Sequence, residues 1–114
     1  MKGSRLAKEY FRLLLKREIA SAERLLERIE NSLQDSDLEK GYLTALRGIL
    51  ASVRTKSYRD SLAHQVIRDR KKASSMIRDF NKRSKTRWES DFDKGYFTAW
   101  KDYLKVIIKS TSLE

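Results

Sequence analysis

The feature that most constrains this chain is a stretch of sequence that occurs twice. Residues 37–46 read Asp-Leu-Glu-Lys-Gly-Tyr-Leu-Thr-Ala-Leu and return 54 positions later, at 91–100, as Asp-Phe-Asp-Lys-Gly-Tyr-Phe-Thr-Ala-Trp. Lys-Gly-Tyr and Thr-Ala are unchanged, and the remaining changes are conservative. A repeat of this length, with two helical patterns in each copy, predicts two helical hairpins that share one core.

The repeat fixes the expected domain organisation. We predict a single domain over residues 1–114, with repeat 1 at 4–53 and repeat 2 at 57–109. The expected fold is all-α, a four-helix bundle without strands in which a pseudo-twofold axis relates the two hairpins. Composition favours the same class, because the chain has no Pro, four Gly and 37% charged residues.

Apolar periodicity predicts a first helix that runs without interruption from Ser4 to about Gln34. Its apolar residues, spaced three and four apart, are Phe11, Leu15, Ile19, Ala22, Leu26, Ile29 and Leu33. Leu13 and Leu14 widen this stripe. The segment Tyr10–Leu15 is therefore expected to carry extra apolar surface that a partner could cover.

Matching capping signals are expected to start the second and fourth helices. Ser36, followed three residues later by Glu39, forms a capping box, and Ser90 with Asp93 repeats the device in the second copy. The fourth helix is expected to end near residue 109. The sequence does not forbid a second helix that is continuous with the third, but we expect a break between them because the first hairpin has to turn before the second can pack on it.

Two glycines occupy equivalent places inside these helices. Gly41 and Ala45 lie four residues apart on one helix face, and so do Gly95 and Ala99. A helical Gly costs up to ~1 kcal/mol relative to Ala, so its presence in both copies needs a physical reason. We expect the second and fourth helices to pack closely at these four positions. A ligand-binding glycine is the weaker interpretation, because no phosphate-loop pattern surrounds either one.

Positive charge is concentrated in one part of the chain. The net charge is +10, and residues 54–87 contribute +9 of it, with twelve basic and three acidic side chains. The flanks nearly cancel, since 1–53 hold ten basic and eight acidic residues and 88–114 hold four and five. Localised charge of one sign indicates an anionic partner more specifically than a high isoelectric point does.

The third predicted helix, from about residue 57 to 88, gathers these cations on one face. At 100° per residue, four of them fall within roughly 60° of one another, over a length of about 21 Å that can meet several phosphates. A solvated polar face is the ordinary alternative, but its charges are usually mixed in sign. The candidate nucleic-acid-binding residues are Lys71, Arg78, Lys82 and Lys85, broadened by Arg68 and Arg83.

These features predict a small, non-enzymatic accessory protein that binds nucleic acid without sequence specificity, with DNA and RNA left undistinguished. The alternative is a helical scaffold whose basic third docks an acidic protein, with a homodimer formed through Tyr10–Leu15 or the face of Phe97 and Leu104. No helix-turn-helix, zinc-finger, RNA-recognition or Walker pattern is visible. Aromatic residues of the last third follow helical spacing, which favours a core role over base stacking.

Catalytic, metal and cofactor sites have little support in the sequence. His64 is the sole histidine and there is no Cys, so no metal-ligand cluster or nucleophilic triad is visible. No run of about 18 apolar residues or apolar leader is present, which predicts a cytoplasmic protein with no membrane partner. Two Asn, two Gln and two Met, beside abundant Lys, Arg and Glu, suit a heat-adapted protein.

Overall fold

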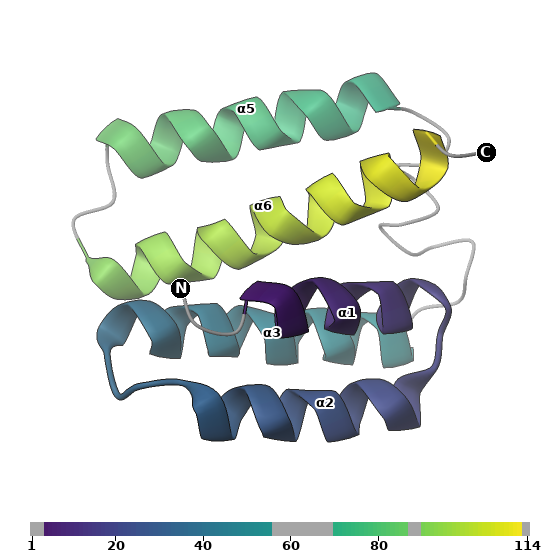
Figure 1. The fold of residues 1–114 in the computed structure, drawn as a ribbon. Helices are drawn as coiled ribbons and strands as arrows, with labels where there is room; N and C mark the ends of the chain where they lie inside the picture. Colours follow the sequence, from purple (N-terminus) through teal and green to yellow (C-terminus); the bar gives the residue numbers. More distant parts are fainter. Residues whose placement is uncertain (1–3, 56–69, 87–89, 113–114) are drawn as a thin grey trace.

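The computed structural model describes residues 4–55, 70–86 and 90–112 (Figure 1). The predicted all-helical class is confirmed, because these ranges form five helices and contain no strand. The helices are α1 (Ser4–Leu15), α2 (Ile19–Ser32), α3 (Asp37–Thr55), α5 (Arg70–Thr86) and α6 (Asp91–Ser112). The join between the predicted second and third helices falls in 56–69, outside the described residues, as does His64.

The helices are stacked around a central pair, α3 and α6 (Figure 1). α2 packs on α3, α5 packs on α6, and α1 packs on both α2 and α6. In Figure 1 α3 and α6 run in the same direction, close at their N-terminal ends and apart at the other end. The core is built from apolar residues of α1, α2, α3 and α6, and its largest fully buried side chains are Tyr10, Phe11, Leu14, Ile29, Leu46, Ile49, Leu104 and Ile107.

The close approach of α3 and α6 is made at the two repeated glycines. Gly41 and Gly95 are buried, and Ala45 and Ala99 beside them are fully buried. A Cβ at Gly41 would overlap the carbonyl oxygen of Phe92 and lie 2.7 Å from its carbonyl carbon. In return, a Cβ at Gly95 would overlap the carbonyl oxygen of Leu38. Each glycine therefore accommodates the backbone of the other helix.

The prediction of one uninterrupted helix from Ser4 to Gln34 is wrong. The chain turns at Lys16–Glu18, so this region forms two helices, and the described ranges hold five helices where four were predicted for the chain. Arg17 has a φ of 58°, in the left-handed region that non-glycine residues rarely adopt. The expected single stripe is in fact two shorter stripes, one on each helix.

Backbone hydrogen bonds define this turn as a Schellman helix end without its usual glycine. The Arg17 N–H donates to the Leu14 carbonyl at 3.0 Å, and the Glu18 N–H donates to the Leu13 carbonyl at 2.9 Å. The Arg17 guanidinium also donates to the carbonyl oxygen of Val53, near the end of α3, at 3.1 Å. That bond satisfies an end carbonyl of α3 and helps to hold the turn in place.

The segment Tyr10–Leu15 is mostly core, which corrects the expectation of a partner surface there. Tyr10 and Phe11 are fully buried. The Tyr10 hydroxyl donates to the Leu46 carbonyl of α3 at 2.9 Å, and the Phe11 ring lies 5.3 Å from the Tyr103 ring of α6. α1 therefore contacts both helices of the central pair and buries most of its apolar side chains against them.

Both predicted N-caps are confirmed. The Ser36 hydroxyl oxygen accepts from the Glu39 N–H at 3.2 Å, and the Ser90 hydroxyl oxygen accepts from the Asp93 N–H at 3.0 Å. α3 and α6 begin at the next residue in each case. Equivalent caps give the two central helices equivalent starts.

Three buried tyrosines make the fold sensitive to alkaline pH. Burial raises the pKa of Tyr103 to about 12 and also raises the pKa of Tyr10 and of Tyr42, whose hydroxyl donates to the Asp102 carboxylate at 3.0 Å. In the unfolded chain a tyrosine titrates near pH ~10. Above that pH the folded chain binds more protons than the unfolded chain, so the stability these groups provide is present below it and is lost as pH rises.

We therefore expect the free energy of unfolding to fall above pH ~10, by at most ~1.4 kcal/mol per pH unit for each tyrosine. Urea unfolding between about pH 8 and pH 11 measures this slope. The Tyr103→Phe variant removes one titrating group and should have a shallower slope. A stability that stays constant across this range would contradict the assignment.

Candidate nucleic-acid interface

α5 lies at the outer edge of the stack and is attached through one of its faces (Figure 1). Met76 and Ile77 are half-buried and pack against the core. The Lys101 ammonium of α6 donates to the Asn81 side-chain oxygen of α5 at 3.0 Å. These contacts set the rotation of α5 and leave its opposite face to solvent.

A line of exposed polar side chains runs along that opposite face. Lys71, Ser75, Arg78 and Lys82 are exposed and follow a spacing of four, three and four residues, which places them on one side of a helix. From the first to the last, the line is about 16 Å long. Within the part of the chain that the structure describes, neither Lys71 nor Arg78 forms an ion pair. We call Lys71, Ser75, Arg78 and Lys82 the basic line.

The other predicted binding residues are placed less completely. Lys85 and Arg83 belong to the last turns of α5, but their side chains are outside the description. Arg68 precedes α5 and lies outside the described residues altogether. Lys71, Arg78 and Lys82 are thus the predicted cations that the structure brings onto one described surface.

The charge of α5 differs from that of the helices around it. α5 holds seven basic residues and one acidic residue, Asp79. Five cations on the other described helices have carboxylate partners, in the pairs Arg12–Glu9, Lys40–Asp35, Arg47–Glu30, Arg54–Glu23 and Lys94–Asp91. Among the described helices, α5 therefore carries the largest excess of positive charge, with one carboxylate among seven cations.

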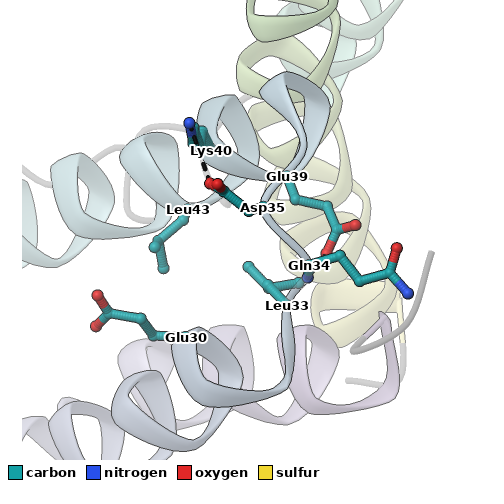
Figure 2. Close-up of a pocket in the computed structure, with 7 residues that line it drawn as sticks. All are labelled: Glu30, Leu33, Gln34, Asp35, Glu39, Lys40 and Leu43. Carbon is teal, nitrogen blue, oxygen red and sulfur yellow. Dashed lines mark hydrogen bonds and ion pairs between the residues drawn. The ribbon is translucent and has the colours of Figure 1, made fainter.

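A small hollow lies between the end of α2 and the start of α3 (Figure 2). Its charged groups already have partners: the Lys40 ammonium pairs with Asp35 at 3.1 Å, Arg47 reaches Glu30 at 2.6 Å, and the Glu39 carboxylate accepts from the Gln34 N–H at 2.6 Å. The hydrogen bond to Asp35 raises the pKa of Lys40. These bonds stabilise the turn between α2 and α3, so we assign the charged groups around the hollow a structural role.

Metal-ligating side chains do not gather anywhere in the described ranges, where no group of three or more His, Cys, Asp or Glu could hold an ion. Among the same helices, none is both long enough and apolar enough to cross a bilayer. No protein-family model, curated protein or solved structure matches the chain. The basic line therefore has to be interpreted from its own geometry and charge.

Sequence reasoning identified the cations of this face but missed the contact that orients it. The Asn81–Lys101 hydrogen bond joins residues twenty positions apart on different helices. Nothing in the periodicity of either helix signals such a pair, because it depends on how the two helices are placed against each other. The spacing of polar residues therefore predicted a cationic face on this helix but not the contacts that orient that face toward solvent.

Proposed function

We propose that this protein binds nucleic acid without sequence preference through the basic line of α5. The observation that carries the proposal is that Lys71 and Arg78 are exposed on one helix face and form no ion pair with the described residues. Cations placed on phosphates release condensed counterions, which drives binding at low salt. Exposed Ser74 and Ser75 can donate to phosphate oxygens. Phosphate contacts carry no base information, so sequence preference should be weak.

The proposal describes a cytoplasmic, non-enzymatic protein whose two repeats each contain a helical hairpin, α2–α3 and α5–α6, related by a pseudo-twofold axis. Element boundaries support the duplication, because α3 and α6 begin at Asp37 and Asp91, 54 residues apart, each directly after a capping serine. The reciprocal contacts of Gly41 and Gly95 support it as well.

The two copies then differ in the charge of their outer helices. α2 holds two basic and three acidic residues, whereas α5 holds seven basic and one acidic. Two of the α2 carboxylates, Glu23 and Glu30, pair with Arg54 and Arg47 of α3. Charge of one sign thus distinguishes the outer helix of the second copy, and this is the helix to which we assign binding.

Reversing two charges of the basic line should abolish most of the affinity. We expect the double variant Lys71→Glu, Arg78→Glu to bind a labelled oligonucleotide at least ~10-fold more weakly than the unchanged protein at low salt, measured by fluorescence anisotropy. Both side chains are exposed on a helix, so the fold should be retained, which circular dichroism checks.

The matched control is the double variant Arg5→Glu, Lys8→Glu. It also replaces one Arg and one Lys, and both residues are exposed on α1. Because the change in net charge is the same, the control should lose much less affinity if the face matters. Equal losses in the two variants, or full affinity in the first, would refute the assignment to α5.

A further inference from the structure

We infer that the ligand of the basic line is duplex DNA, with α5 lying in the major groove. This inference rests on the proposed function and adds the class of nucleic acid to it. It follows from the shape of the surface that carries the cations, from the side chains this surface lacks, and from the width of the grooves available.

The surface is a convex ridge on a single helix. α5 lies at one outer edge of the described helices and packs on α6, with α2 at the opposite edge (Figure 1). A helix with its side chains is about 10–12 Å across, and the major groove of B-form DNA is about 12 Å wide. A ridge that carries cations along its crest and polar hydroxyls beside them can enter such a groove and reach phosphates on both strands.

The described part of this face offers no base-stacking platform. Its exposed side chains on α5 are Lys71, Ser74, Ser75, Arg78, Asp79 and Lys82. On the neighbouring α6, the rings of Tyr96 and Trp100 pack against the core. Phe92, which is 38% exposed, belongs to the first turn of α6 at the crossing with α3 and not to α5. Proteins that bind single strands usually combine a basic groove with exposed aromatic rings. A convex face whose described side chains on α5 include no exposed ring is better matched to a duplex.

Groove width separates DNA from RNA. The major groove of A-form RNA is deep and narrow and does not admit side chains, whereas its wide groove is shallow and presents 2′-hydroxyls. A ridge of helix width can lie in the DNA major groove and has no equivalent seat on an RNA duplex. The same cations should therefore make fewer phosphate contacts on RNA.

Three probes of one sequence test this inference: a DNA duplex of about 20 base pairs, its single strand, and the RNA duplex. We expect the DNA duplex to bind at least ~10-fold tighter than either of the others at the same salt concentration. The Lys71→Glu, Arg78→Glu variant should remove this preference. A single strand or RNA duplex that binds as tightly as the DNA duplex overturns the inference while leaving α5 as the binding face.

Placement in the groove has its own measurement. Guanine N7 atoms line the major groove, so a seated α5 should protect them from methylation by dimethyl sulfate. Unprotected N7 atoms in a saturated complex would overturn the placement. If none of the three probes has an affinity that depends on Lys71 and Arg78, the proposed function itself fails, which is a result distinct from the loss of duplex preference.

Discussion

Replacing Gly41 with alanine is expected to lower the free energy of unfolding by about 3 kcal/mol, the upper end of the usual cost of overpacking. The new Cβ would overlap the Phe92 carbonyl oxygen and come within 2.7 Å of the carbonyl carbon. A backbone carbonyl inside a helix cannot rotate away, so α3 and α6 would have to separate and lose packing along the central pair. Gly95→Ala should cost a similar amount, since its Cβ would overlap the Leu38 carbonyl oxygen. Urea unfolding followed by circular dichroism measures both.

Gly48→Ala supplies the matched control for these variants. Gly48 is exposed on the same helix α3, and a Cβ there would meet nothing within 4 Å. The substitution should therefore stabilise the protein by up to ~1 kcal/mol through helix propensity alone. A Gly41→Ala protein as stable as Gly48→Ala would show that the two backbones are not in contact.

The double variant Gly41→Ala, Gly95→Ala tests whether the two contacts form one crossing. Separation of the helices to admit the first Cβ also makes room for the second, so the combined loss should be smaller than the sum of the single losses. Fully additive losses would indicate two independent contacts.

Features encoded locally could be read from the sequence. Ser36 and Ser90 cap the two central helices because a hydroxyl three residues before a free N–H is a local arrangement, independent of the rest of the fold. The repeated Gly41 and Gly95 drew attention to a close approach for a similar reason, since a glycine inside a helix has a local cost that packing must offset.

The turn at Arg17 could not be read in this way. A Schellman helix end is normally signalled by glycine, and no glycine is present at this turn. Because Leu15 and Ile19 keep the helical spacing of apolar residues across the turn, the sequence predicted one continuous helix. Arg17 adopts its left-handed conformation in a fold where its guanidinium reaches the Val53 carbonyl, 36 residues away in sequence. A long-range contact of this kind leaves no trace in local periodicity.

For the candidate interface too, some features could be predicted from the sequence and others depend on tertiary contacts. The concentration of cations in one third of the chain is a property of composition, and the helical spacing of Lys71, Arg78 and Lys82 places them on one face. That this face points outward depends on Met76 and Ile77 packing inward and on the bond from Lys101 to Asn81, both of which are tertiary.

Truncating Phe11 to alanine is expected to destabilise the protein by about 3–5 kcal/mol, as for other fully buried phenylalanines. Phe11 has no exposed surface, and its ring lies 5.9 Å from that of Tyr10 and 5.3 Å from that of Tyr103 on α6. Its removal would leave a cavity where α1 meets the central pair. Urea unfolding measures the loss.

Leu38→Ala is the control for this substitution, because Leu38 is 36% exposed and its truncation removes less buried surface. We expect that variant to lose no more than ~1 kcal/mol. The comparison also separates the two roles considered for Tyr10–Leu15. If this segment were a docking surface for a second copy, Phe11→Ala would change the sedimentation of the protein and leave its unfolding free energy nearly unchanged. A loss of stability with unchanged sedimentation would instead show that Tyr10–Leu15 completes the core of its own chain and is not a docking surface for a second copy.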